Sequence, residues 1–251
     1  MILLSIFNSN LRRPTKAINC GLYRYGRLPD YLYDEYIENK KIIIVGPAGY
    51  LQGKGLGKYI DSFDIVVRIN HAIPILNKID YGARTDVLYH ILSRRGKDGI
   101  HKKYITEEEI KEWKKNKVVW LISRHDDRSK RIQALKHYLN GNVDWITIKS
   151  NFYNKLKKET GKAPNTGILT IMHILSLKPK TVNVIGFDFY KSGVYEKYGD
   201  IKDNENAGVV NAVWHDVEEQ IIYLKKILQE NDNLIIDDYF KDVIYKKEVA
   251  K

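Results

Sequence analysis

The sequence predicts an α/β protein with a mainly parallel sheet flanked by helices, and two observations carry this prediction. Short apolar segments rich in β-branched residues recur along the chain, and segments with helical periodicity separate them. This alternation is typical of a doubly wound parallel sheet. We expect strands at 42–45, 64–68, 117–122, 144–148 and 181–186, and helices at 106–115, 129–139, 167–177 and 217–229.

Local sequence supports individual elements and suggests a simple domain organisation. Residues 42–45 read IIIV and end in Gly46, as expected of a strand buried on both faces. Thr106 and Glu109 form the Thr-x-x-Glu pattern that begins a helix. Residues 1–40 show little pattern and are interpreted as an N-terminal leader. Residues 41–251 contain no repeat, low-complexity tract or linker, so we expect a single domain there.

Composition excludes several classes of protein. The chain has 251 residues, of which 43% are hydrophobic and 29% charged, and these fractions argue against a disordered or coiled-coil protein. The one cysteine, Cys20, cannot form an internal disulfide or a cysteine-based zinc cluster. No signal peptide or transmembrane segment is visible, so we predict a cytoplasmic protein and leave peripheral membrane contact open.

The positive charge is concentrated in one segment. The chain carries 42 basic and 31 acidic residues, a net charge of +11, and residues 91–160 hold 18 basic against 9 acidic residues. Such a segment could bind nucleic acid, anionic lipid or an acidic small molecule, or form a solvated face. A nucleic-acid-binding protein is therefore one alternative, but the segment has few interleaved aromatic residues for base stacking.

In a doubly wound sheet, ligands bind beyond the carboxyl ends of the strands, so the residues after each apolar segment are the first candidates. Gly46 and Gly49 follow the first strand, where glycines let backbone approach a ligand. Residues 46–58 read GPAGYLQGKGLGK and fit neither the phosphate-loop nor the dinucleotide spacing. The remaining candidate segments are 69–71, 123–126, 187–189 and the predicted helix start at 164–167.

The sequence also points away from metal chemistry. It contains no Asp-x-Asp and no HExxH, so we expect no metal site and no cofactor. The charge of a leaving phosphate would then be stabilised by basic, polar and backbone groups. His215 stands at the entrance of the last periodic helix, and a single histidine in such a place is usually structural.

Four segments, in order, resemble the motifs of the eukaryotic-type sialyltransferases, glycosyltransferase family 29. Residues 41–92 resemble the large sialylmotif, and residues 163–188, APNTGILTIMHILSLKPKTVNVIGFD, resemble the small one. Residues 197–200 look like the short third motif, and residues 215–219 look like the very small motif. Together, the four motifs indicate this family far more specifically than any single loop does.

The resemblance implies a Rossmann-like GT-A variant fold and a reaction. A sialic acid, or a related 2-keto sugar acid such as an octulosonate, would pass with inversion from its cytidine monophosphate (CMP) conjugate to a hydroxyl of a glycan acceptor. His215 matches the family's general base, and Lys197 would meet the leaving phosphate, with Arg124 or His125 as further candidates. The residues implied to bind the donor are Asn70, Asn165, Thr166, Gly167 and Phe187.

This sequence departs from the family pattern at four positions. Pro47 replaces an asparagine of the large motif, and Asn165 replaces a serine of the small motif. Lys197 replaces the histidine that begins the third motif, and Gln220 stands where the very small motif has glutamate. The departures leave the fold unaffected, and an inactive nucleotide-sugar-binding member of the same fold is the second alternative.

Overall fold

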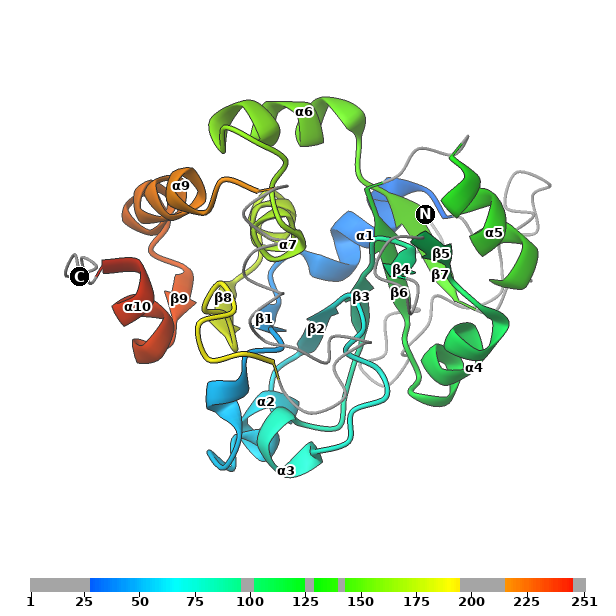
Figure 1. Cartoon of the computed structure of the whole chain (residues 1–251), viewed down its shortest axis with the longest axis horizontal. Helices are drawn as coiled ribbons and strands as arrows, with labels where there is room; N and C mark the ends of the chain where they lie inside the picture. The colour runs from blue at the N-terminus through cyan, green and yellow to red at the C-terminus, as the bar shows by residue number, and fades with distance from the viewer. Residues whose placement is uncertain (1–27, 96–101, 125–128, 140–142, 195–214, 246–251) are drawn as a thin grey trace, which may run out of the picture.

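A computed structural model describes residues 28–95, 102–124, 129–139, 143–194 and 215–245 of the chain. Within these residues, seven strands form one sheet in the order β7-β6-β3-β2-β1-β8-β9, and every neighbouring pair is parallel (Figure 1). This confirms the predicted fold class. The strands are β1 (Lys41–Val45), β2 (Ile65–Ile69), β3 (Val87–Tyr89), β6 (Trp120–Ser123), β7 (Asp144–Thr147), β8 (Thr181–Ile185) and β9 (Leu234–Ile236).

Helices cover both faces of the sheet, and Figure 1 shows α6 and α7 on one side of it and α2 and α3 on the other. Side chains of α1 (Asp30–Ile37), α6 (Ser150–Glu159), α7 (Thr166–Leu175), α9 (Val217–Glu230) and α10 (Asp238–Tyr245) share one core cluster with the strands. The opposite face is covered by α2 (Gly57–Asp61), α3 (Lys78–Tyr81), α4 (Glu107–Lys115) and α5 (Lys130–Leu139).

The apolar run of β1 explains its central place in the sheet. Ile42 and Ile44 pack into the core on the α7 side, and Ile43 and Val45 pack into the core on the α2 side. All four side chains are buried. Because successive side chains of a strand point to opposite faces, only a strand with apolar residues at every position can be covered on both sides.

The five predicted strands and four predicted helices are confirmed, with ends that differ by up to three residues. The capping box at the start of α4 is present, because Thr106 and Glu109 each accept a hydrogen bond from the other's backbone N–H. The sequence analysis missed β3, β9 and an antiparallel hairpin of β4 (Ser93–Arg95) and β5 (Lys102–Tyr104).

The boundary expected at residue 40 falls after a helix that packs into the core. Tyr33 and Ile37 on α1 are completely buried, and the Tyr33 hydroxyl lies 3.1 Å from the Tyr89 hydroxyl of β3. Tyr33 also packs edge-to-face on Trp120, with ring centroids 5.2 Å apart. Residues 30–37 are therefore part of the packed structure. No helix in the described part of the chain is both long enough and apolar enough to cross a membrane.

Candidate active site

The segments that follow β1, β2 and β8 meet the amino end of α7 at the carboxyl edge of the sheet. Asn70 follows β2, and its side-chain amide donates to the Thr166 hydroxyl at 3.3 Å. Asn70 takes a positive φ of 48°, which asparagine tolerates better than most residues. Its amide oxygen accepts from the Ile91 backbone N–H at 3.3 Å, so contacts with two segments hold the side chain in place. The structure thus brings together two predicted donor-binding residues that are 96 positions apart.

Phe187 lies against two of the predicted glycines. A Cβ atom on Gly167 would be 2.4 Å from Cε1 of Phe187, and a Cβ on Gly46 would be 2.8 Å from its Cδ2. The Gly46 Cβ would also be 2.1 Å from the carbonyl oxygen of Gly186. A side chain at either position would displace the aromatic ring. Glycine is therefore required here by close packing within the chain.

Gly49 is constrained in a similar way. A Cβ atom on Gly49 would lie 2.6 Å from the carbonyl oxygen of Ser192. The neighbouring Tyr50 backbone N–H donates to the Ser192 hydroxyl at 3.1 Å. These contacts join the loop after β1 to the loop after β8. That Gly46 and Gly49 contact substrate stays a prediction.

Asn165 is the N-cap of α7. Its side-chain oxygen accepts the Ile168 backbone N–H at 2.8 Å, which satisfies one free donor of the first helical turn. Its own backbone N–H donates to Oε1 of Gln220 on α9 at 3.2 Å. Asparagine therefore replaces the family's serine with a residue that caps a helix equally well.

His215 lies just before α9, beside the segment that leads into α7. Nδ1 of His215 is 2.6 Å from the carbonyl oxygen of Ala163. Because a carbonyl oxygen only accepts, the ring donates from Nδ1, and in the neutral ring Nε2 then carries a free lone pair. Asp216, the N-cap of α9, accepts the Glu219 backbone N–H at 3.2 Å and fixes the start of this helix.

Three effects act on the pKa of His215. Partial burial lowers it below its ordinary value, because a charged ring loses hydration. The hydrogen bond to Ala163 favours the protonated ring and opposes this shift. The positive charge of Arg124 lowers the pKa further. The balance is a lowered pKa, so His215 is neutral near pH 7.

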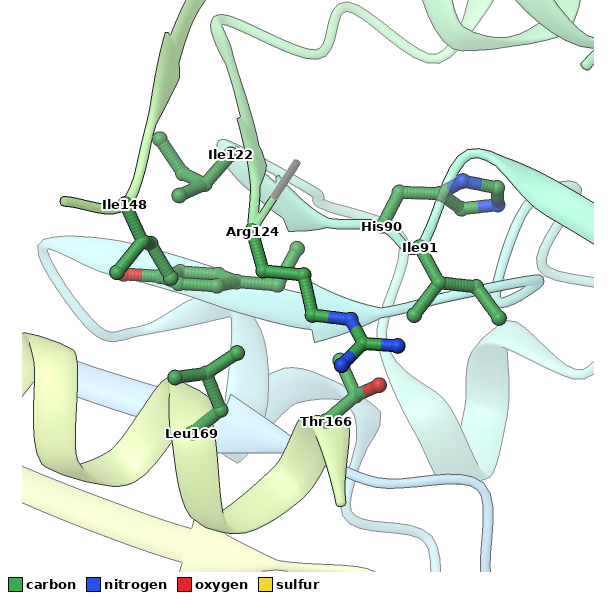
Figure 2. Close-up of a pocket in the computed structure, with 8 residues that line it drawn as sticks. His90, Ile91, Ile122, Arg124, Ile148, Thr166 and Leu169 are labelled. Atoms are coloured by element: carbon green, nitrogen blue, oxygen red, sulfur yellow. The ribbon is translucent and has the colours of Figure 1, made fainter. Parts of the chain in front are cut away.

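A pocket opens between α7 and the carboxyl ends of β3 and β6. Figure 2 shows the Arg124 guanidinium extending over Thr166, with isoleucine and leucine side chains around it. Arg124 follows β6, and one of its terminal nitrogens donates to the Tyr153 hydroxyl of α6. The pocket is lined by Tyr89, His90, Ile91, Ile122, Arg124, Ile148, Thr166 and Leu169.

Sequence reasoning missed the contribution of β3 to this pocket. Tyr89, His90 and Ile91 line it, yet β3 has only three residues and no predicted strand covers it. The segment lies in the quoted large motif, and that was the only signal for it. Two other expected residues, Lys197 and His125, lie outside the described residues.

The glycine-rich loop at 53–57 is anchored by a carboxylate of the same chain. The backbone N–H groups of Gly53 and Gly55 each donate to Asp80 at 2.7 Å. These two hydrogen bonds are the main causes that hold the pKa of Asp80 below its usual value. The loop's amide donors therefore already hold an anion, and the loop is structural.

One side-chain cluster has the composition of a metal site. Single ligand atoms of His71, His90 and Glu109 lie within 4.8 Å of one another. However, Nδ1 of His90 accepts the Leu92 backbone N–H at 2.9 Å, so in the neutral ring the proton is on Nε2 and no ring lone pair is left for a metal. Glu109 already accepts the Thr106 backbone N–H at 2.8 Å. The cluster is thus explained by hydrogen bonding and does not fit a metal as it stands.

Solved structures with the same architecture are sialyltransferases. A mammalian sialyltransferase in complex with Gal-beta-1-3GalNAc-ortho-nitrophenol matches with a TM-score of 0.53 and 16% identity, over 84% of this chain and 73% of that chain. The sialyltransferase CstII from Campylobacter jejuni, in complex with the substrate analogue cytidine-5'-monophosphate, matches with a TM-score of 0.50 and 14% identity, over 79% of this chain and 80% of that chain. At these identities the likeness concerns the fold, and the Rossmann-like GT-A prediction is confirmed.

Curated relatives carry the same activity name. The type 2 lactosamine alpha-2,3-sialyltransferase of Homo sapiens is 26% identical over 223 residues, and that of Pan troglodytes gives the same values. The alignment covers 80% of this chain and 66% of each relative, so the chain spans about two thirds of their length. The prediction of a cytoplasmic protein is wrong, because these relatives are Golgi-type sialyltransferases. It was based on the absence of a visible signal peptide and transmembrane segment, and such an absence does not determine the compartment.

The sequence model of one family covers most of the chain. The model described as glycosyltransferase family 29 (sialyltransferase) matches residues 34–232, which include Asn70, the turn at 165–167, Phe187 and His215. The match begins within α1, in agreement with the packing of that helix. The chain therefore belongs to glycosyltransferase family 29, the sialyltransferases.

Proposed function

We propose that this protein transfers a sialic acid, or a related 2-keto sugar acid, from its CMP conjugate to a hydroxyl of a glycan acceptor. The reaction inverts the configuration at the reacting carbon and needs no metal ion. His215 accepts the proton of the attacking hydroxyl. Asn70, Thr166, Gly167 and Phe187 hold the donor, and Gly46, Gly49 and Asn165 support that site.

The hydrogen bond between His215 and Ala163 is the observation that supports a general base best. It directs the ring proton to Nδ1 and leaves Nε2 of the neutral ring free to accept a proton. The lowered pKa keeps the ring unprotonated near pH 7. A sugar hydroxyl is a weak nucleophile, so removal of its proton as it attacks lowers the barrier.

The amino end of α7 supports binding of the donor's nucleotide part. Backbone N–H groups at the start of a helix favour anions, and Gly167 in the first turn lets the Phe187 ring pack against this helix start. Thr166 and Asn70 contact each other there, at 3.3 Å between hydroxyl and amide nitrogen. The Phe187 ring, which packs on Gly167, supplies an aromatic surface for the cytosine base.

Two observations support metal independence. The sequence holds no Asp-x-Asp pair, and among the described residues no carboxylate lines the pocket around Arg124. With no acidic pair to hold a divalent ion against the phosphate, cationic and N–H groups would carry the developing charge.

The test is an assay of nucleotide release from CMP-sialic acid, with and without a glycan acceptor and with an excess of chelator. The proposal expects CMP as the released nucleotide and a rate that the chelator leaves nearly unchanged. Slow hydrolysis of the donor without acceptor would identify an active protein even when the acceptor is poorly matched. A rate that collapses with chelator and returns with magnesium or manganese would contradict the mechanism. A protein that binds CMP but never releases it from any CMP-sugar would be an inactive member of the family.

A further inference from the structure

Arg124 is a cation without a charged partner in the part of the chain that the structure describes. Arg84, by contrast, forms an ion pair with Asp86 at 2.7 Å. Arg124 forms no such pair there, and its Nε atom is buried without a hydrogen-bond acceptor. Arg124 is partly buried, and a partly desolvated charge that lacks a counter-ion costs free energy that a bound anion would reduce.

Among the residues that the structure describes, Tyr153 holds the guanidinium in place from one side. A terminal nitrogen donates to the Tyr153 hydroxyl, and the guanidinium carbon lies 5.3 Å from the centre of the Tyr153 ring. Tyr153 belongs to α6, so the side chain is held by an element other than β6, which Arg124 follows. Figure 2 shows the guanidinium over Thr166, with Ile91 beside it. A planar cation with this orientation suits a planar anion such as a carboxylate.

The place of Arg124 relative to His215 distinguishes between the two anionic groups of the proposed donor. In an inverting displacement, the base and the attacking hydroxyl lie on one side of the reacting carbon and the leaving phosphate lies on the other. Arg124 lines the same pocket as Thr166 at the start of α7, and His215 is hydrogen-bonded to Ala163 in the segment that leads into this helix, so the guanidinium lies on the side of the base. The carboxylate of a 2-keto sugar acid is bonded to the reacting carbon itself and lies beside the line of attack.

On this geometry, which rests on the proposed function, we propose that Arg124 binds the carboxylate of the donor sugar acid and so selects sugar acids as donors. Tyr153 positions the guanidinium.

The experiment compares three ligands: cytidine, CMP and the 3-fluoro analogue of CMP-sialic acid, which retains the carboxylate and reacts slowly. Their dissociation constants are measured by calorimetry for the wild type and for Arg124→Gln, Arg124→Lys and Tyr153→Phe. Lys149→Gln is the matched control, because it removes one positive charge from an exposed side chain at the start of α6.

We expect Arg124→Gln to weaken the fluoro analogue by about 10-fold or more, as for loss of a charge-assisted hydrogen bond, and to leave CMP within about twofold of wild type. Arg124→Lys should recover part of the loss, Tyr153→Phe should lose less, and Lys149→Gln should behave as wild type. A parallel loss for CMP and the analogue, with cytidine unchanged, would assign Arg124 to the phosphate and overturn the proposal. Unchanged affinity for all three ligands would also overturn it. Failure of the wild type to bind CMP would instead reject the proposed function.

Discussion

The backbone N–H of Asn165 donates to Oε1 of Gln220, and this hydrogen bond joins the turn before α7 to the helix that follows His215. The two residues are 55 positions apart, and Gln220 is completely buried. The bond connects the small and the very small sialylmotif at the point where both approach the proposed donor site. It also gives a physical role to a position at which this chain departs from its family.

Replacing Gln220 by leucine should uncouple these two segments. The substitution leaves the partly buried Asn165 N–H without its acceptor, which costs about 1 kcal/mol or somewhat more. Chemical unfolding should show this loss, and transfer should fall as well because His215 loses its fixed position relative to the turn. Gln220→Glu keeps an acceptor oxygen and serves as the matched control. A leucine variant as stable and as active as wild type would show that the bond has no role.

Alanine substitutions at two glycines should distinguish the loss of stability caused by a steric clash from the loss caused by backbone strain. A Cβ at Gly46 meets the Gly186 carbonyl oxygen at 2.1 Å, and backbone atoms cannot move aside cheaply. A Cβ at Gly53 meets nothing within 4 Å, so only its positive φ of 78° opposes alanine there. We expect Gly53→Ala to cost about 1–2 kcal/mol and Gly46→Ala clearly more. Melting temperatures of the two variants test this order, and equal losses would refute it.

Stability should also depend on pH through His173. Burial lowers the pKa of this histidine to about 4, below its ordinary value of 6.5. The unfolded chain then binds a proton between pH 6.5 and 4 that the folded chain does not, so stability falls as the pH drops through this window. The loss amounts to at most about 1.4 kcal/mol per pH unit for this one group.

His173→Gln removes the titrating group and provides the comparison. The difference in unfolding free energy between variant and wild type should change between pH 6.5 and 4 and stay constant above pH 7. Nδ1 of His173 lies 2.7 Å from the Tyr89 hydroxyl, so glutamine retains a polar partner there. A difference that is the same at pH 7 and pH 4.5 would show that His173 titrates normally.

The local sequence was sufficient to predict those elements that are determined by neighbouring residues in the chain. The signals for the Thr106 cap and for an apolar strand such as β1 each lie within a few consecutive residues, and both were predicted. The helix α1 was missed because Tyr33 and Ile37 show little pattern and are buried only by packing on the sheet. Short strands such as β3 likewise depend on their neighbours, since three residues hold no visible period.

The candidate site was predictable in part. Asn70 and Thr166 could be expected at one edge of the sheet. Asn70 follows a strand and Thr166 begins a helix, and in a doubly wound parallel sheet strand ends and helix starts both lie at the carboxyl edge. The role of Gly46 and Gly167 as packing positions for Phe187 was not readable, because it depends on distances across three segments. The same is true of the contact between Arg124 and Tyr153, which joins two elements that no local pattern relates.

Substitution of His215 by asparagine should abolish transfer while the protein stays folded. Asparagine can still donate to the Ala163 carbonyl oxygen, 2.6 Å from Nδ1 in the wild type, but it has no group that accepts a proton. Loss of a general base costs about 100-fold to 10,000-fold in rate. The affinity for CMP should remain near that of wild type, since the ring belongs to the acceptor side of the reaction.

In the wild type, transfer should fall on acidification as the imidazole is protonated, and the fall should begin below the ordinary histidine pKa because burial lowers the pKa of His215. If His215 served only to anchor α9, asparagine would preserve turnover, and alanine would lower stability by about 0.5–1.5 kcal/mol with normal turnover per folded molecule. Melting curves and transfer rates measured on the same preparations of both variants therefore decide between a base and an anchor.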